Sequence, residues 1–176
     1  LGTKLNGDIV VNLAAVHRDD ITDPDEYYST NVEGARVLCE VCEKKGINKI
    51  VFTSSVAVYG FAPPGTAEDG ALDPFNEYGR TKALAEDVYR DWRSKDPENR
   101  SLIIVRPTVV FGEGNRGNVY NLLNQINSGA FAMIGNGKNK KSMAYVENLS
   151  AFLVKCIESD EKYAVYNYVD TPDFTM

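Results

Sequence analysis

A tyrosine and a lysine four residues apart are the first pair in this sequence whose types and spacing suggest chemistry. They are Tyr78 and Lys82, at the two ends of the run Tyr-Gly-Arg-Thr-Lys. Side chains at positions i and i+4 lie on one face of a helix, so the ammonium can approach the phenol. A free tyrosine has a pKa of about 10, and a nearby positive charge lowers it by favouring the phenolate. Such a pair could act as an acid/base on an alcohol substrate.

A serine upstream of this pair lies where it could bind the same substrate oxygen. Ser55 closes the run Thr53-Ser54-Ser55 at the end of an apolar, β-branched segment. Open parallel sheets bind their ligands at the carboxyl ends of their strands. Taken singly, the tyrosine–lysine pair also suits a helix surface, and the hydroxyls also suit turn caps. Together, Ser55, Tyr78 and Lys82 predict a catalytic set.

The elements that must hold these residues alternate between strands and helices. Apolar, β-branched runs predict buried strands at residues 8–15, 49–55 and 101–106. Helical periodicity predicts helices at residues 25–45, with Gly46 as the C-cap, and at 77–95. This alternation predicts an α/β fold with a doubly wound parallel sheet. Later segments predict helices at about 117–127 and 146–158, a short apolar piece at 131–134 and a strand at 164–169.

Five motifs follow one another along the chain. They are Asn12-Leu13-Ala14-Ala15, Asn31-Val32-Glu33-Gly34, the segment 53–60, Tyr78-Gly79-Arg80-Thr81-Lys82 and the segment 106–112. In order and spacing they resemble the extended short-chain dehydrogenases/reductases, also called the NAD-dependent epimerase/dehydratase family, which includes UDP-galactose 4-epimerase. The resemblance covers essentially the whole chain, and it implies a Rossmann-like sheet.

The resemblance implies roles for residues by position. Ser55, Tyr78 and Lys82 match the catalytic set, with Tyr78 as the acid/base. Contacts to NAD are implied for Leu13, Ala14, Ala15, His17, Asn31, Thr53, Ser54, Tyr78, Lys82, Pro107 and Val109. Contacts to a nucleotide-sugar substrate are implied for Ser55, Val56, Ala57, Asn118, Val119 and Lys141. Lys141 stands where relatives commonly have an arginine that grips the substrate's diphosphate, and lysine keeps only the charge.

The two residues after Ser55 separate the branches of the family. Branches that eliminate water or carbon dioxide place acidic residues there, whereas Val56 and Ala57 cannot transfer protons. The resemblance therefore implies redox chemistry at one carbon, as in a nucleotide-sugar 4-epimerase. A dehydrogenase or reductase of another alcohol is the alternative within enzymes. A non-catalytic dinucleotide-sensing protein of the same fold is the third hypothesis, and the intact Ser55, Tyr78 and Lys82 argue against it.

The largest departure from the family pattern is a missing motif. The family's glycine-rich turn, which holds a pyrophosphate at a helix N-terminus, does not occur in these residues. We therefore expect a fragment of a longer chain, with residues 1–112 forming part of a dinucleotide-binding domain. Residues 113–176 are expected to form part of a substrate-binding region, with some elements returning to the Rossmann core. The residue that selects NAD or NADP would follow the missing turn, so NADP stays open beside NAD.

The composition of the chain excludes some classes of binding partner. A net charge of −6 and a single small basic cluster argue against nucleic acid. No apolar run reaches the roughly 20 residues of a membrane helix, and three cysteines without a disulfide pattern suit a reducing cytoplasm. The C-x-x-C of Cys39 and Cys42 lies in a helical apolar pattern and predicts core packing, and Glu68 predicts a solvated loop charge. Relatives often form homodimers through the helices expected at 25–45 and 77–95, although the monomer could cover the same apolar residues.

Overall fold

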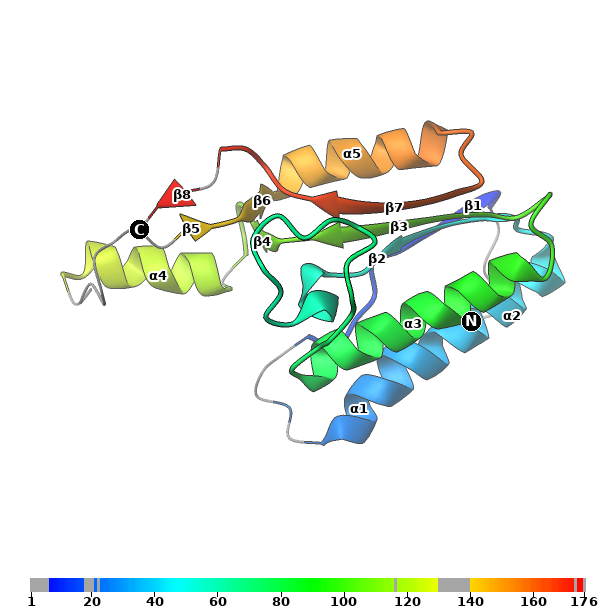
Figure 1. The fold of residues 1–176 in the computed structure, drawn as a ribbon, viewed down its shortest axis with the longest axis horizontal. Helices are drawn as coiled ribbons and strands as arrows, with labels where there is room; N and C mark the ends of the chain where they lie inside the picture. The colour runs from blue at the N-terminus through cyan, green and yellow to red at the C-terminus, as the bar shows by residue number, and fades with distance from the viewer. Residues whose placement is uncertain are drawn as a thin grey trace.

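A parallel sheet of four strands forms the centre of the molecule. The computed structural model describes residues 7–17, 21, 23–115, 117–129, 140–172 and 174–175. The sheet has the order β1-β2-β3-β7, formed by Ile9–Asn12, Lys49–Thr53, Ser101–Pro107 and Tyr163–Tyr168. Helices α2 (Gly34–Lys45) and α3 (Glu77–Ser94) cover one face, and α5 (Val146–Glu158) covers the other (Figure 1). The predicted doubly wound α/β fold is confirmed.

Alternation along the strands divides the core into two layers. Successive side chains of a strand point to opposite faces of the sheet, so Ile50 and Phe52 of β2 face α2 and α3, while Val51 faces α5. The first layer includes Val10, Ala35, Cys39, Cys42, Ala85, Tyr89, Trp92, Leu102 and Ile104. The second layer includes Ile103, Val105, Leu149, Leu153 and Cys156. Because both faces are covered, the strands can be apolar at nearly every position.

The helix expected at residues 25–45 is divided into three pieces. Helix α1 (Pro24–Tyr28) is followed by a π-helical turn at Ser29–Glu33 and then by α2. Gly46 ends α2 with a left-handed φ of 68°, as the sequence predicts for a C-cap. The π-helical turn buries Asn31, whose amide reaches the chain beyond β1. Such turns often occur at functional sites.

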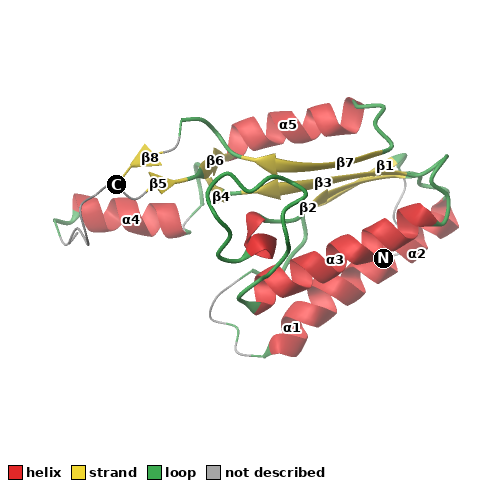
Figure 2. Ribbon diagram, in the orientation of Figure 1, coloured by secondary structure: helices red, strands yellow, loops and turns green. Residues whose placement is uncertain are grey.

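The remaining elements lie beyond the carboxyl ends of the sheet, where β4, β5, β6, β8 and α4 gather in Figure 2. Strand β4 (Val109–Phe111) pairs with β6 (Met143–Tyr145), and β5 (Lys140–Lys141) pairs with β8 (Phe174–Thr175). Helix α4 (Asn118–Asn127) agrees with the expected helix at 117–127. The predicted apolar piece at 131–134 lies outside the described residues, and the division near residue 112 stays a prediction.

Strand ends are the main local difference from expectation. The strand expected at 8–15 ends at Asn12, whose side-chain oxygen accepts from the Ala14 backbone N–H at 3.0 Å. The strand expected at 101–106 continues through Pro107, which completes its pairing with β7 at Tyr168. Within the described residues, no helix is long and apolar enough to cross a membrane.

Candidate active site

Ser55 lies in the turn that follows β2. It is the N-cap of a 3-10 helical turn, η2 (Val56–Tyr59), and its Oγ accepts from the Ala57 backbone N–H at 3.1 Å. The same hydroxyl forms a hydrogen bond with the side chain of Tyr78. The structure therefore brings together two of the three residues that the sequence predicts to be catalytic.

Tyr78 lies on the first turn of α3, and this turn packs directly on η2. Asn76 caps the helix by accepting from the Gly79 backbone N–H at 2.8 Å. Gly79 is buried, and a Cβ at this position would overlap the carbonyl oxygen of Ala57. Glycine is thus needed here for close approach of two backbones, which sets the distance between Tyr78 and Ser55.

Lys82 is directed at the end of β2. Its side chain is buried, and its Nζ donates to the Thr53 carbonyl at 2.8 Å and lies 4.7 Å from the centroid of the Phe52 ring. Burial lowers the pKa of Lys82 to about 8, although the negative charge of Glu86 opposes this shift. The ammonium is therefore mostly charged at neutral pH and titrates slightly above it.

The pKa of Tyr78 differs from the sequence expectation. We expect Lys82 to lower it, but in this structure burial raises the pKa of Tyr78, and the hydrogen bond with Ser55 only partly offsets the rise. A low-dielectric surrounding favours the neutral phenol, and Lys82 directs its ammonium at the Thr53 carbonyl. Tyr78 is thus a neutral proton donor in this state, and the predicted lowering is wrong for it.

Asn31 fixes the segment beyond β1 against α3. Its Oδ1 accepts from the Val16 backbone N–H at 2.8 Å, and its Nδ2 donates to the Val16 carbonyl at 3.1 Å and to Thr81 Oγ1 at 2.9 Å. Among the predicted cofactor contacts of this segment, Leu13, Ala14 and His17 are exposed and Ala15 is half-buried. Asn31 therefore ties this segment to the helix that carries Tyr78 and Lys82.

The other predicted contacts lie on the ends of further elements. Thr53 and Ser54 follow one another at the end of β2, Val56 and Ala57 are half-buried on η2, Pro107 is buried at the end of β3, and Val109 begins β4. Asn118 and Val119 begin α4, and Lys141 belongs to β5. Contacts of these residues with a cofactor or substrate stay predictions.

A buried ion pair beneath the site was not found from the sequence. Glu86, one turn after Lys82, accepts two hydrogen bonds from Arg106, from Nε at 2.9 Å and Nη2 at 2.7 Å. Both side chains are almost inaccessible to solvent. Burial raises the pKa of the Glu86 carboxyl, but the hydrogen bonds from Arg106 outweigh it, and the pKa lies below its usual value. The spacing in the sequence could have identified Glu86, because it continues the i, i+4 series of Tyr78 and Lys82.

Arg106 also holds the loop that follows η2. Its Nη1 donates to the Tyr59 hydroxyl and, at 3.0 Å, to the Glu68 carbonyl. Tyr59 donates to Asn167 Oδ1 at 2.8 Å, and the Glu68 carboxylate accepts from the Asn167 backbone N–H at 2.8 Å. Glu68 is exposed, as the sequence predicts, but it is also bonded to β7. The network joins β3, α3, β7 and the segment that carries Ser55.

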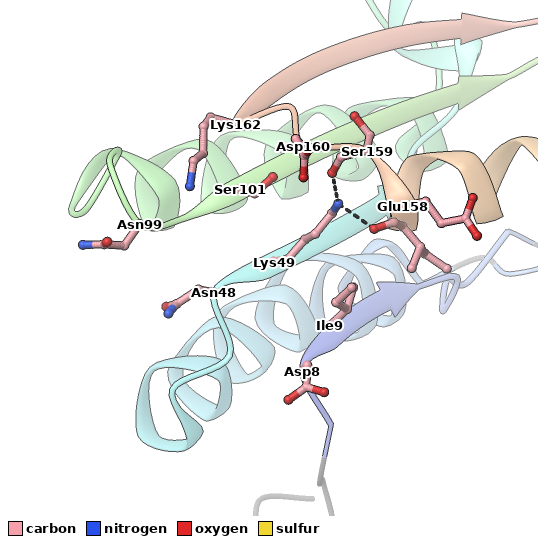
Figure 3. A pocket seen from close by; sticks show the side chains of 11 residues that line it. Asp8, Ile9, Asn48, Lys49, Asn99, Ser101, Glu158, Ser159, Asp160 and Lys162 are labelled. Atoms are coloured by element: carbon pink, nitrogen blue, oxygen red, sulfur yellow. Dashed lines mark hydrogen bonds between the residues drawn. The ribbon is translucent and has the colours of Figure 1, made fainter.

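A pocket of about 310 Å³ lies at the opposite, amino edge of the sheet (Figure 3). Lys49, at the start of β2, is among its lining residues. The Lys49 ammonium donates to the carbonyls of Ile157, at 2.7 Å, and Ser159, at the end of α5. This lysine therefore satisfies the carbonyl groups of a helix C-terminus. The pocket lies away from Ser55 and is not part of the candidate active site.

The described cysteines lie in the core as protonated thiols. Burial raises the pKa of Cys39 to about 12 and that of Cys42 to about 11, so both thiols stay protonated in the core. The predicted core packing of the C-x-x-C is confirmed. Among the described residues, no group of three or more His, Cys, Asp or Glu side chains could hold a metal ion.

The fold is a parallel α/β sheet, and Ser55, Tyr78 and Lys82 lie together where its strand β2 ends. A family model for the NAD dependent epimerase/dehydratase family matches residues 2–168. The chain belongs to this family, as its motifs predict.

Known relatives share the family fold and differ in what they act on. N-acetyl-alpha-D-glucosaminyl-diphospho-ditrans,octacis-undecaprenol 4-epimerase of Escherichia coli O157:H7 is 54% identical over 170 residues, covering 96% of this chain and 51% of the relative. UDP-glucose 4-epimerase of Bacillus subtilis (strain 168) is 38% identical over 104 residues, covering 57% of this chain and 30% of that protein.

Solved structures agree with the fold. MoeE5 in complex with UDP-glucose and NAD superposes with a TM-score of 0.82 at 26% identity, covering 96% of this chain and 58% of that one. A crystal structure of UDP-galactose 4-epimerase gives a TM-score of 0.77 at 25% identity, covering 98% and 59%. The chain thus spans little more than half the length of these relatives.

Proposed function

We propose that these residues form the catalytic part of an NAD-dependent sugar 4-epimerase. The observation that carries the proposal is the Ser55–Tyr78 hydrogen bond, with Lys82 buried at the adjoining strand end. NAD, when bound, supplies a hydride acceptor that can return the hydride to the opposite face of the sugar. Tyr78 must first release its own phenol proton to solvent; the phenolate then takes the proton of the C4 hydroxyl and gives it back, and Ser55 orients that hydroxyl. General acid–base help of this kind contributes about 10²–10⁴-fold.

The residues around this set fit a dinucleotide. The Thr53 Oγ1 atom is buried and has no hydrogen-bond partner among the described residues, so it is available to a bound polar group. Leu13 and Ala14 expose an apolar surface that Asn31 holds in place through Val16. Lys82 uses one of its three N–H bonds on the Thr53 carbonyl and retains others for a cofactor hydroxyl.

The reaction stops at epimerisation because the two residues that follow Ser55 supply no further acid or base. Val56 and Ala57 are half-buried on η2 and cannot remove a second proton. A dehydrogenase or reductase of another alcohol would instead accumulate reduced cofactor, which absorbance detects. A dinucleotide sensor of this fold would bind cofactor without turning over any sugar.

The sugar's carrier has two candidates that share a diphosphate. The sequence predicts a nucleotide sugar, and the Bacillus subtilis relative is named for UDP-glucose. The Escherichia coli relative, more similar to this chain, is named for a sugar on diphospho-undecaprenol. Lys141 is the predicted diphosphate contact in both cases, because a diphosphate carries the same negative charge on either carrier.

Replacement of the acid/base tests the proposal. In the complete enzyme that contains these residues, Tyr78→Phe removes the proton carrier and is expected to reduce interconversion of the two C4 epimers at least about 100-fold. NMR of the sugar mixture measures this. Tyr163→Phe is the matched control, because Tyr163 is exposed at the start of β7 and its hydroxyl only accepts an exposed hydrogen bond from Arg90 Nε. Unchanged turnover by the Tyr78→Phe enzyme would show that the catalytic assignment is wrong.

Assembly and location are also proposals. The free, buried cysteines Cys39, Cys42 and Cys156 are consistent with a reducing cytoplasm. A homodimer through α1–α2 and α3 stays a prediction, since Cys39 and Trp92 of these helices pack on the sheet of the same chain. Light scattering on the complete enzyme measures the oligomeric state.

A further inference from the structure

Two phenylalanine rings stand out from the surface beside the candidate active site. Phe61 is 88% exposed and Phe75 is 59% exposed, and their rings stack with centroids 4.5 Å apart at 20°. Both belong to the loop of residues 60–76, which joins η2 to α3. Clustered exposed apolar groups of this kind mark binding surfaces more often than isolated ones do.

The loop that carries these rings is firmly attached. Its Asp73 N–H donates to the Val58 carbonyl at 3.1 Å, and Gly60 packs so closely on Asp73 that a Cβ would overlap its carbonyl oxygen. Asn167 Nδ2 donates to the Thr66 carbonyl at 3.2 Å, in addition to the Glu68 contacts described above. The rings are therefore displayed by a fixed backbone, and their exposure does not come from an unattached loop.

A hollow of about 430 Å³ adjoins the two rings. Its lining includes Phe61, Phe75, Ala62, Pro63, Ala71 and Pro74, and the charged residue among those that line it is Asp73. The Thr66 hydroxyl in the lining donates to the Pro63 carbonyl at 2.7 Å. A nucleobase needs donors and acceptors for its edge, and this lining offers few that are free. An uncharged hydrocarbon fits it better.

Charge on the loop argues in the same direction. Residues 60–76 contain Glu68, Asp69 and Asp73 and no lysine or arginine. Acidic side chains repel both a diphosphate and the anionic headgroups of a bilayer, which recruit basic segments. The loop of residues 60–76 can therefore bind the apolar end of a substrate, while the diphosphate binds at another part of the site.

The position suits such a substrate. Phe75 precedes Tyr78 by three residues, so their Cα atoms lie within about 11 Å of one another. In such a molecule the chain follows the diphosphate, so the part that can lie on the rings is apolar and set apart from the phosphates. We propose that Phe61 and Phe75 bind isoprene units beyond the diphosphate in a polyprenyl chain that carries the sugar. This inference rests on the proposed 4-epimerase function and selects the polyprenyl carrier.

The experiment varies the chain attached to one sugar. The complete enzyme is assayed with methyl-, geranyl- and farnesyl-diphospho-N-acetylglucosamine and with UDP-N-acetylglucosamine. For the wild-type enzyme, kcat/KM is expected to rise at least about tenfold from the methyl to the farnesyl compound. In Phe61→Ser/Phe75→Ser this rise should disappear through an increase in KM for the geranyl and farnesyl compounds. The kcat values, and the turnover of the methyl compound and of UDP-N-acetylglucosamine, should be unchanged. Val154→Ser, at an exposed apolar position on α5, is the control and should keep the rise.

Several results would overturn the proposal. These are a flat chain-length series in the wild-type enzyme, a rise that survives in the double variant, or an equal loss for every compound, which would indicate a structural role. Loss of vesicle co-sedimentation by the double variant without substrate would assign the rings to a bilayer instead. Calorimetry with the Tyr78→Phe enzyme measures the binding affinities of the farnesyl and methyl compounds, and so the dependence on chain length, without turnover. A failure of the epimerase proposal is thereby distinguished from a failure of this one.

Discussion

At the scale of single residues, burial acts on Tyr78 and Lys82 in ways that complement each other. It raises the pKa of the phenol and lowers the pKa of the ammonium to about 8, so both groups are protonated at neutral pH. Tyr78 must therefore release its phenol proton before it can accept the proton of a sugar hydroxyl. The hydrogen bond with Ser55 favours the phenolate of Tyr78, and the hydroxyl of a bound substrate would compete for this hydrogen bond.

The buried ammonium of Lys82 predicts a pH dependence of stability. Below pH 8 it is charged in both the folded and the unfolded state, and its burial cost is fully present. Between about 8 and its usual 10.5 the folded state releases the proton first, so the unfolded state binds more protons and stability rises with pH. Relative to the Lys82→Met variant, the wild type is expected to gain up to about 3 kcal/mol in free energy of unfolding between pH 7 and pH 10.5.

Denaturant unfolding at the two pH values measures this gain. Lys44→Met is the matched control, because the Lys44 side chain is 75% exposed and should give a nearly constant difference from the wild type. Parallel stability curves for the wild type and Lys82→Met would contradict the lowered pKa.

At the scale of elements, the close packing of α3 on η2 positions Tyr78 relative to Ser55. A methyl group at Gly79 would overlap the backbone of Ala57, and neither backbone segment can easily move. Gly79→Ala is therefore expected to cost about 1–3 kcal/mol of stability and to reduce kcat by separating Tyr78 from Ser55. Thermal unfolding and epimer interconversion measure the two effects.

Gly34 provides the control for this prediction. It begins α2, and the nearest atom to an added Cβ would be 4.0 Å away. Gly34→Ala should be neutral or slightly stabilising, since alanine favours a helix over glycine. If Gly79→Ala behaved like Gly34→Ala, the packing of α3 on η2 would not set the site.

The sequence predicts an element well when local residues determine it, and poorly when contacts between distant residues do. The strands at 49–55 and 101–106 and the helix at 77–95 follow from apolar pattern and breaker residues, which act locally. The π-helical turn before α2 does not, because it depends on Asn31 reaching Val16 across the sheet end. The catalytic set follows from its motifs, whereas the pKa of Tyr78 depends on burial that only the assembled fold supplies.

At the scale of the whole molecule, the buried network of Glu86 and Arg106 joins the parts of the site. It connects α3 to β3 and, through Tyr59 and Asn167, to η2 and β7. Breaking a buried ion pair by removing one partner typically costs about 3–5 kcal/mol, so this region of the fold is strongly coupled. The Ser55 turn, the Tyr78 helix and the Phe61 loop are therefore joined by one hydrogen-bond network.

The most direct test of the account follows the hydrogen on C4 of the sugar. The complete enzyme is supplied with a sugar diphosphate substrate that carries deuterium at C4, in ordinary water, and the epimerised product is examined by mass spectrometry and NMR. In the proposed mechanism hydride leaves and returns within one site and Tyr78 exchanges only the oxygen-bound proton, so the product is expected to keep deuterium at C4. Replacement of that deuterium by hydrogen from water would contradict hydride transfer and the roles given to Ser55, Tyr78 and Lys82.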